Sequence, residues 1–377
     1  MQSLQVRKRL HGCKTDRKRP LPLFIYPKIM SSKNIVEHQF YTFDELINKL
    51  KKKDLAIVNE SKLLKYLKFF NYENVINGYK SPFLTNDQFN IFVSNSNSQM
   101  IIDFFNFNRV ISTILISDLH SIEMKLSSGI AYELMKIINE LHPTHSAFNS
   151  LLNSEIHKIF SSNSKRINEL ETKFQQNFDE LSKNKEYINT KWTKWQDVPL
   201  YSLALLLTFG NSIRLFANLN NQIQQRILTN YFEPIKDVNI KTFISLMYYF
   251  KELRNKISHN EPIYRFKYNL NQLIYRIRLL DTSISRKDIQ RVIESDFSNF
   301  LCENSNPKNS FKLFNMIKII AKITENKKLV NIAKAKIKKL ELAIAGTFIK
   351  IETTNQVFLP CEEAWKNIRN FLGDDED

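Results

Sequence analysis

Helix-breaking residues are scarce along this chain, and their scarcity limits the folds open to it. The 377 residues include 6 glycines and 10 prolines, so residues that form turns are few. Leucine, isoleucine, lysine, asparagine and phenylalanine dominate instead, and apolar residues recur at intervals of three and four, as on one face of a helix. The sequence therefore predicts an all-α fold.

The pattern changes at several polar or proline-containing breaks, which divide the chain into parts. Domains usually contain about 100 to 200 residues, so we expect more than one unit. The expected parts are a basic flexible arm (1–33), an N-terminal helical subdomain (34–100), a helical domain (101–300) that contains an amphipathic helical arm (164–198), and a basic helical C-terminal extension with an acidic tail (301–377).

A formal net charge of +17 indicates a polyanionic partner. Each Lys or Arg that contacts a phosphate releases counterions and adds affinity. The alternative is that a composition rich in Lys and Asn reflects an AT-rich genome. The Lys-rich pattern of the C-terminal extension leaves three interpretations open, namely contact with RNA, the solvated face of a packed helix, or a membrane surface.

Cysteine and histidine positions predict neither disulfides nor a metal site. Cys13, Cys302 and Cys361 are too few and too scattered for a disulfide framework or a zinc cluster. His142 and His145 flank a proline, and no further ligands stand nearby at metal-binding spacing. We therefore expect no metal and no cofactor.

Hydropathy argues for a soluble protein. No apolar run approaches the roughly 18 to 20 residues that cross a bilayer, so we expect a cytoplasmic location and no membrane partner. His120 stands among apolar neighbours, which predicts a core or interface histidine rather than a catalytic one.

The residues with the clearest chemical pattern lie in Phe250–Tyr264. Arg254, Asn255 and His259 stand there in an Arg-Asn-x-x-x-His spacing, at the end of an expected helix that Pro262 closes. Residues four apart share a helix face, and the long Arg side chain reaches toward that face. The three polar groups can therefore converge.

That set of groups suits cleavage of a phosphate ester in RNA without a metal. An imidazole can exchange a proton with a ribose 2′-hydroxyl or a leaving oxygen, and a guanidinium can hold the phosphoryl oxygens. In this interpretation His259 is the acid or base, Arg254 stabilises the phosphate and Asn255 orients the His259 ring. The structural alternative is a His that only complements the helix dipole.

The same stretch, LRNKISHNEPIY, resembles the signature of the AbiD/AbiF-type abortive-infection (phage resistance) family, which belongs to the HEPN superfamily. Three upstream segments resemble other parts of that family in the same order: Thr42–Phe83, Phe107–Tyr132, and Val198–Phe216, in which a helix is expected to open at Pro199. The resemblance implies an HEPN-type helical bundle that acts on RNA in bacterial antiphage defence.

Further expectations come from the resemblance alone. It implies a toxin-like, metal-independent endoribonuclease that leaves 2′,3′-cyclic phosphate and 5′-hydroxyl ends. It also implies a homodimer, and a small non-coding RNA that restrains the activity in the manner of a toxin–antitoxin pair. Lys256, Arg265 and Lys267 are the expected RNA-binding residues around the motif. The alternative is a non-catalytic RNA-binding protein in which the motif binds RNA or supports the dimer, and the choice between the two stays open here.

The chain departs from the family pattern at four positions. Asn108, Ser112, Ser127 and Leu205 stand where the family has charged residues. We expect that internal charge pairs are replaced there by apolar packing.

Overall fold

The computed structural model describes residues 40–85, 91–141, 207–266, 312–346, 349–351 and 356–372, and six single positions between 172 and 291. The predicted basic arm (1–33) and nearly all of the predicted amphipathic arm (164–198) lie outside these residues. Residues 373–377, which include the predicted acidic tail, lie outside them as well. Phe43–Asp377 clusters as one compact unit. The domain boundaries expected at 100 and 300 stay predictions.

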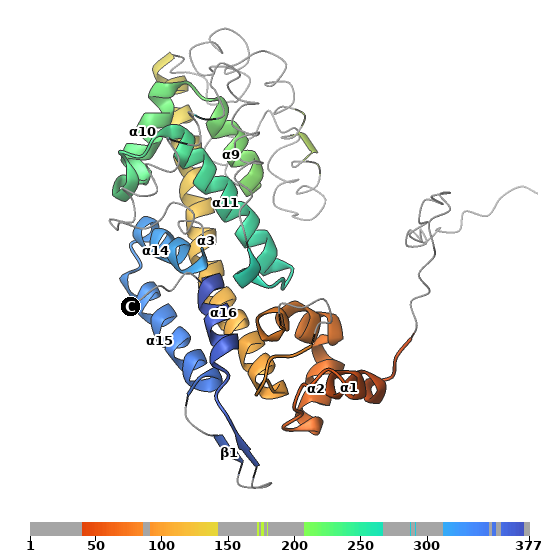
Figure 1. Cartoon of the computed structure of the whole chain (residues 1–377). Coiled ribbons are helices and arrows are strands. Elements are labelled where there is room, and N and C mark those ends of the chain that lie inside the picture. The colour runs from red at the N-terminus through yellow and green to blue at the C-terminus, as the bar shows by residue number, and fades with distance from the viewer. Residues whose placement is uncertain are drawn as a thin grey trace, which may run out of the picture. The chain divides into compact units, whose positions relative to one another are not determined.

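Helices make up nearly all of the described chain, which confirms the predicted all-α fold (Figure 1). The α-helices are α1 (Phe43–Lys51), α2 (Glu60–Phe70), α3 (Ser98–Leu141), α9 (Phe209–Asn218), α10 (Asn221–Tyr231), α11 (Ile240–Ser258), α14 (Leu313–Thr324), α15 (Lys327–Ile344) and α16 (Glu362–Leu372). Short helical turns are η1 (Glu73–Asn77), η2 (Ser81–Phe83), η5 (Glu233–Ile235) and η6 (Ile263–Arg265). Strands β1 (Ile349–Ile351) and β2 (Gln356–Phe358) pair antiparallel, with Lys350 opposite Val357.

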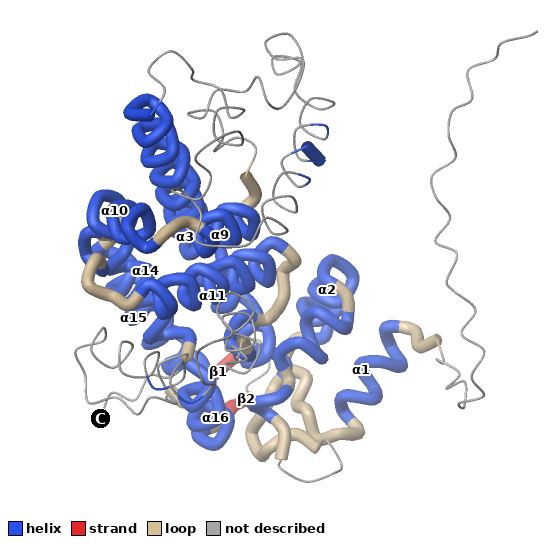
Figure 2. The backbone as a smooth tube through the Cα atoms, turned by 90° about the horizontal axis from the view of Figure 1, so that it is seen from above, coloured by secondary structure: helices blue, strands red, loops and turns tan. Residues whose placement is uncertain are grey.

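The 44-residue helix α3 is the element on which the other helices pack. Its apolar residues Leu115, Leu119, Ile122, Leu126 and Ile130 follow helical spacing and are fully buried. Helices α2, α9, α10, α11, α14 and α15 all contact α3, and Figures 1 and 2 show them arranged along its length.

The apolar character of α3 also bears on the membrane question. Ser98–Ile137 is long and apolar enough to cross a membrane by length and composition, and an 18-residue window within it has a mean hydropathy of 1.3. No stretch of this kind was expected from the sequence. Half of that window is buried inside the protein, and six helices pack against α3. A buried core helix of this kind meets the same length and composition criteria as a membrane span.

Asparagine and threonine side chains begin several of these helices. Asn59, Asn220 and Asn239 accept hydrogen bonds from backbone N–H groups in the first turns of α2, α10 and α11, which otherwise lack partners. Thr208 caps α9 in an extended conformation. A helix was expected to open at Pro199, which lies outside the described residues, and the described helix of this segment begins at Phe209.

The Lys-rich C-terminal pattern forms two helices joined at Glu325 and Asn326, rather than one. Glu325 adopts a left-handed conformation with φ of 56°, and the Asn326 amide donates to both carboxylate oxygens of Asp118 on α3, at 3.2 and 3.1 Å. In α15 five apolar residues are buried while most of the lysines are exposed, together with the apolar residues Ile332 and Leu342. Exposed lysines fit both the solvated-face interpretation and contact with RNA, so both stay predictions.

The last helix connects the end of the described chain to its beginning. The Asn367 side chain donates to the Pro82 carbonyl at 2.9 Å, and the Cys361 thiol lies 3.4 Å from the Ser94 carbonyl oxygen. Cys361 is buried and free. Residues separated by more than 260 positions thus share one core.

Two buried hydrogen bonds hold the segment that follows α11. The Asn108 side chain on α3 accepts a hydrogen bond from the Ile263 N–H at 2.9 Å. The Tyr264 hydroxyl donates to the Gly78 carbonyl at 2.8 Å, and burial raises the pKa of Tyr264, so this hydroxyl remains a donor. Pro262 packs so closely on Gly78 that a Cβ there would lie 3.3 Å from the proline ring. These contacts fix where α11 ends.

We predict that Asn108→Leu lowers the free energy of unfolding by about 1–3 kcal/mol, because the buried Ile263 N–H loses its acceptor. Asn108→Asp, compared at a pH low enough to keep its buried carboxyl protonated, retains an acceptor oxygen and a donor at the same place and serves as the matched control, with a smaller loss. Urea unfolding of the two variants and the wild type measures the difference. Equal losses in both variants would contradict a role for this hydrogen bond.

Candidate RNA-cleavage site

The predicted motif lies at the C-terminal end of α11, as expected from its position before Pro262. His259 is the C-cap residue, and Asn260 follows in the left-handed conformation with φ of 55°. The Asn260 N–H bonds to the Ile257 carbonyl, and the Glu261 N–H bonds to the Lys256 carbonyl. This pair of bonds is a Schellman motif. It ends the helix at a defined residue and places His259 at the surface.

Arg254 is held by an acidic partner on α3. Its Nη2 lies 3.5 Å from Glu123 Oε2, with side-chain exposures of 33% for Arg254 and 15% for Glu123. Its Nη1 lies 3.3 Å from Asn255 Oδ1. The Arg254 Nε is buried and has no hydrogen-bond partner within the described part of the chain. Glu123 thus orients the Arg254 guanidinium, and a third of the side chain remains exposed to solvent.

Asn255 and His259 do not pair as the sequence interpretation proposed. The Asn255 side chain contacts Arg254, and the two residues are joined to His259 through the backbone, where the His259 N–H donates to the Asn255 carbonyl at 3.0 Å. The His259 side chain is exposed and makes no hydrogen bond to any residue in the described ranges. The structure therefore brings Arg254 and Asn255 together and leaves the imidazole open to solvent.

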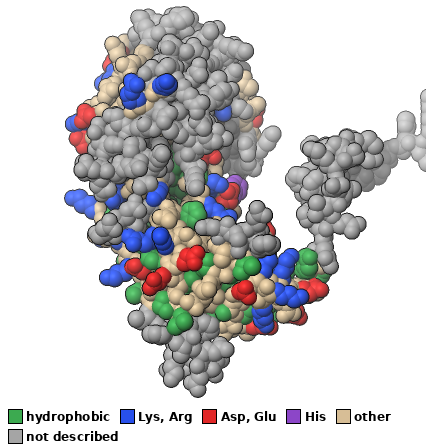
Figure 3. All heavy atoms as spheres, in the orientation of Figure 1, with side chains coloured by type: hydrophobic (Ala, Val, Ile, Leu, Met, Phe, Trp, Pro, Cys, Tyr) green, Lys and Arg blue, Asp and Glu red, His purple; other side chains and the backbone are tan. Residues whose placement is uncertain are grey.

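The predicted RNA-binding residues occupy different environments. Lys256 forms an ion pair with Glu261 and lies 5.9 Å from the Phe266 ring. Arg265 is exposed, with its guanidinium 5.4 Å from the Tyr264 ring. Lys267 lies outside the described residues. Figure 3 shows basic side chains spread over the described face among acidic and apolar ones.

At two of the four positions where the chain departs from the family pattern, the side chain makes a polar contact. Asn108 accepts the hydrogen bond from Ile263 described above, and the Ser127 hydroxyl lies 2.8 Å from the Ser212 hydroxyl in the core. The expected replacement by apolar packing is wrong at both positions. Ser112 lines a cavity, and Leu205 lies outside the described residues.

The histidines and cysteines outside the motif do not form a metal site within the described residues. His120 is exposed on α3, which is inconsistent with a core histidine, and its interface role stays a prediction. Within the described ranges, no group of three His, Cys, Asp or Glu side chains is arranged to hold a metal ion. His142, His145, Cys13 and Cys302 lie outside those ranges.

A cavity of about 490 Å³ begins next to the motif. The end of α2 and the turn after it, α3, and the end of α11 line it, and Ile257 and Asn260 are the contributions of α11. Sequence analysis missed this cavity and the Glu123 partner of Arg254. The resemblance gave a signal for this region, since Glu123 lies within Phe107–Tyr132, one of the segments that resemble the family.

Comparison with known proteins identifies a family. The sequence pattern of the family described as Abi-like protein matches residues 65–265, which is more than half of the 377 residues. No curated protein and no solved structure matches the chain. The matched range begins in α2 and ends in η6, so it contains both the motif and its Glu123 partner. The chain therefore belongs to the Abi-like family of abortive-infection proteins.

Proposed function

We propose that this protein is an antiphage abortive-infection effector that cleaves RNA without a metal, with the site at the end of α11. The observation that carries the proposal is the arrangement of Arg254 and His259. Arg254 is oriented by Glu123 while one third of its side chain stays exposed, and the His259 imidazole is exposed and unpaired within the described chain.

The proposed reaction is a transesterification at phosphorus. His259 removes the proton from a ribose 2′-hydroxyl, and the 2′-oxygen attacks the adjacent phosphorus. Arg254 donates hydrogen bonds to the phosphoryl oxygens as negative charge builds on them. The bond to the 5′-oxygen breaks and that oxygen takes up a proton, which leaves a 2′,3′-cyclic phosphate and a 5′-hydroxyl. Asn255 positions Arg254 through their contact, in place of the His259-orienting role expected from the sequence.

We also propose that two copies of an HEPN-type bundle form the working enzyme. A single motif supplies one imidazole, whereas the reaction uses both a base and an acid. A homodimer that brings two copies of α11 together supplies the second His259. A small non-coding RNA bound over this site would hold the activity in check, and the excess of basic residues supports such binding in the cytoplasm.

We predict that His259→Ala slows RNA cleavage by about 10²–10⁴-fold, because the general base is lost. Arg254→Ala is expected to slow cleavage by about 10²–10³-fold, because a donor to the transition-state oxygens is lost. The measurement is cleavage of a labelled RNA in EDTA by protein stripped of bound nucleic acid in high salt, with mapping of the product ends. Lys52→Ala, which removes an exposed cation just after α1, is the control and should cut like wild type.

The outcomes separate the enzyme from its alternatives. Equal cutting by wild type and His259→Ala would identify a contaminating nuclease. A discrete co-purified RNA with no cutting by any form would contradict the nuclease and favour a non-catalytic RNA-binding protein.

We predict that Glu123→Gln slows cleavage by up to about 100-fold, because the Arg254 guanidinium loses its charged partner and moves from its position. RNA affinity should stay close to that of wild type, since Glu123 itself carries no positive charge. Glu140→Gln on the same helix is the matched control, because Glu140 is exposed. Kinetics at saturating RNA, together with a binding titration, make the comparison. An unchanged rate for Glu123→Gln would argue against a catalytic role for the ion pair.

A further inference from the structure

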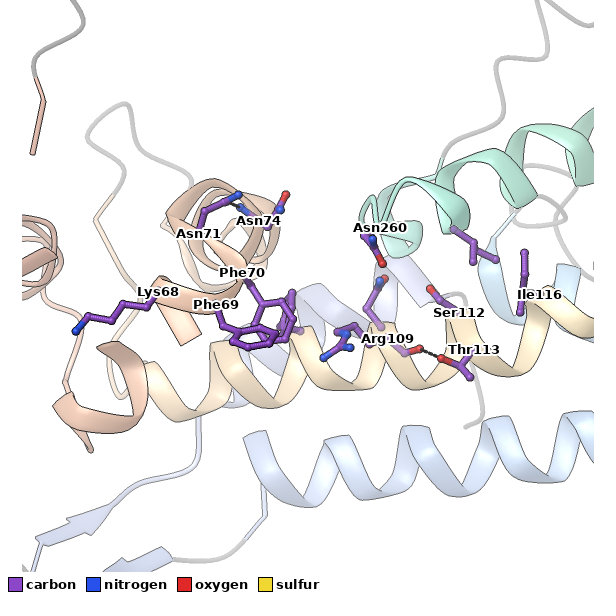
Figure 4. Close-up of a pocket in the computed structure, with 13 residues that line it drawn as sticks. Lys68, Phe69, Phe70, Asn71, Asn74, Arg109, Ser112, Thr113, Ile116 and Asn260 are labelled. Carbon is purple, nitrogen blue, oxygen red and sulfur yellow. Dashed lines mark hydrogen bonds between the residues drawn. The ribbon is translucent and has the colours of Figure 1, made fainter. Parts of the chain in front are cut away.

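The cavity beside the motif is lined by aromatic, amide and basic side chains, and this composition is informative. Phe69 at the end of α2 is 79% exposed although its side chain is large and apolar. Its ring lies 5.0 Å from that of Phe70 in an edge-on arrangement, and Figure 4 shows both rings at one end of the cavity. An exposed aromatic face at a cavity of about 490 Å³ offers a surface on which a planar group can stack.

Arg109 lies next to these rings. Its guanidinium is 4.7 Å from the centre of the Phe70 ring and 5.7 Å from that of Phe105, and Figure 4 shows it extending from α3 toward them. Arg109 is exposed and forms no ion pair with an acidic residue in the described ranges. The aromatic rings therefore hold a cation in place without neutralising it.

The charge of the lining is wholly positive. Lys68 and Arg109 are its two charged residues, and the thirteen lining residues include no Asp or Glu. A ligand with a negative group and an aromatic ring matches such a lining better than a cation or a purely apolar group does.

Amide groups complete the cavity. Asn71 and Asn74 come from the turn after α2, and Asn260 comes from the end of α11 (Figure 4). Asn71 and Asn260 have left-handed backbones, with φ of 61° and 55°, which fix where their side chains start. An amide offers both a donor and an acceptor, as the edges of nucleobases do.

From these features we propose that the cavity binds one unpaired nucleotide of a single-stranded RNA. The base stacks on Phe69 and the Arg109 guanidinium, asparagine amides hydrogen-bond to its edge, and Lys68 attracts the phosphate backbone. The inference rests on the proposed function, because it assigns the substrate class as single-stranded RNA with an extruded base next to the cleaved bond. Asn260, which lines the cavity, directly follows His259, so the cavity reaches the residue next to the proposed base, although the His259 side chain itself is not part of the lining.

Binding of a short single-stranded RNA to the full-length protein tests the proposal without depending on cleavage. The RNA carries a 2′-O-methyl group at every position, which removes the nucleophilic hydroxyl and blocks cutting, and 2-aminopurine at one position at a time. Anisotropy gives affinity, and 2-aminopurine fluorescence reports which base leaves its stack. The same strand annealed to its complement is the duplex probe.

Phe69→Ala should weaken single-strand binding by about 10-fold to 100-fold, the range expected for loss of one base–aromatic stack. This variant should also lack the change in 2-aminopurine fluorescence that wild type produces when the label stands at one particular position of the RNA. Phe69→Trp should restore both signals, which a merely structural role would not predict. Tyr132→Ala, which removes another exposed aromatic side chain, should bind like wild type. Duplex RNA should bind more weakly and without dependence on Phe69.

Separate outcomes would overturn the two proposals. Wild-type affinity and an unchanged 2-aminopurine signal in Phe69→Ala would overturn the nucleotide site, and leave RNA cleavage at His259 standing. The nucleotide site would also be overturned if duplex and single strand bound equally well and Phe69→Ala changed neither affinity. If single-strand binding depends on Phe69 but the protein does not cut RNA that has free 2′-hydroxyls, the nucleotide site is supported and the nuclease is overturned.

Discussion

Burial of α3 is the constraint on which the described structure depends. A 44-residue helix with apolar residues over much of its surface is stable in water only where other elements cover it, and removal of apolar surface from water contributes roughly 25 cal/mol per Å². Six helices from before and after it in the chain provide that cover. The position of each of these helices, α11 included, is consequently set by the apolar surface that it buries against α3.

The candidate site is a direct result of this arrangement. Helix α11 packs on α3, so Arg254 meets Glu123, and the segment after α11 meets Asn108. Buried hydrogen bonds hold one side of the helix end while His259 on the other side stays exposed. The proposed acid–base chemistry needs this exposure, because a polymeric substrate must approach the imidazole from solvent.

Sequence patterns predicted the helices and the end of the motif helix well, since helical spacing and the stop at Pro262 are local properties. They failed where the outcome depended on partners far away in the chain. Asn108 and Ser127 looked like lost charges, yet each found a polar partner, in Ile263 and Ser212. A further failure was local: Asn255 was expected to orient His259, but its amide oxygen lies 3.3 Å from Nη1 of the adjacent Arg254.

By itself the sequence determined that the chain is helical, that it is strongly basic, and that Arg254 and His259 fall at one helix end, because spacing and composition decide those properties. Only the tertiary structure decided that Glu123 orients Arg254 and that the turn after α2 meets the end of α11 around a cavity. Those contacts join residues more than 100 positions apart. They arise from how helices pack on α3, which no local pattern encodes.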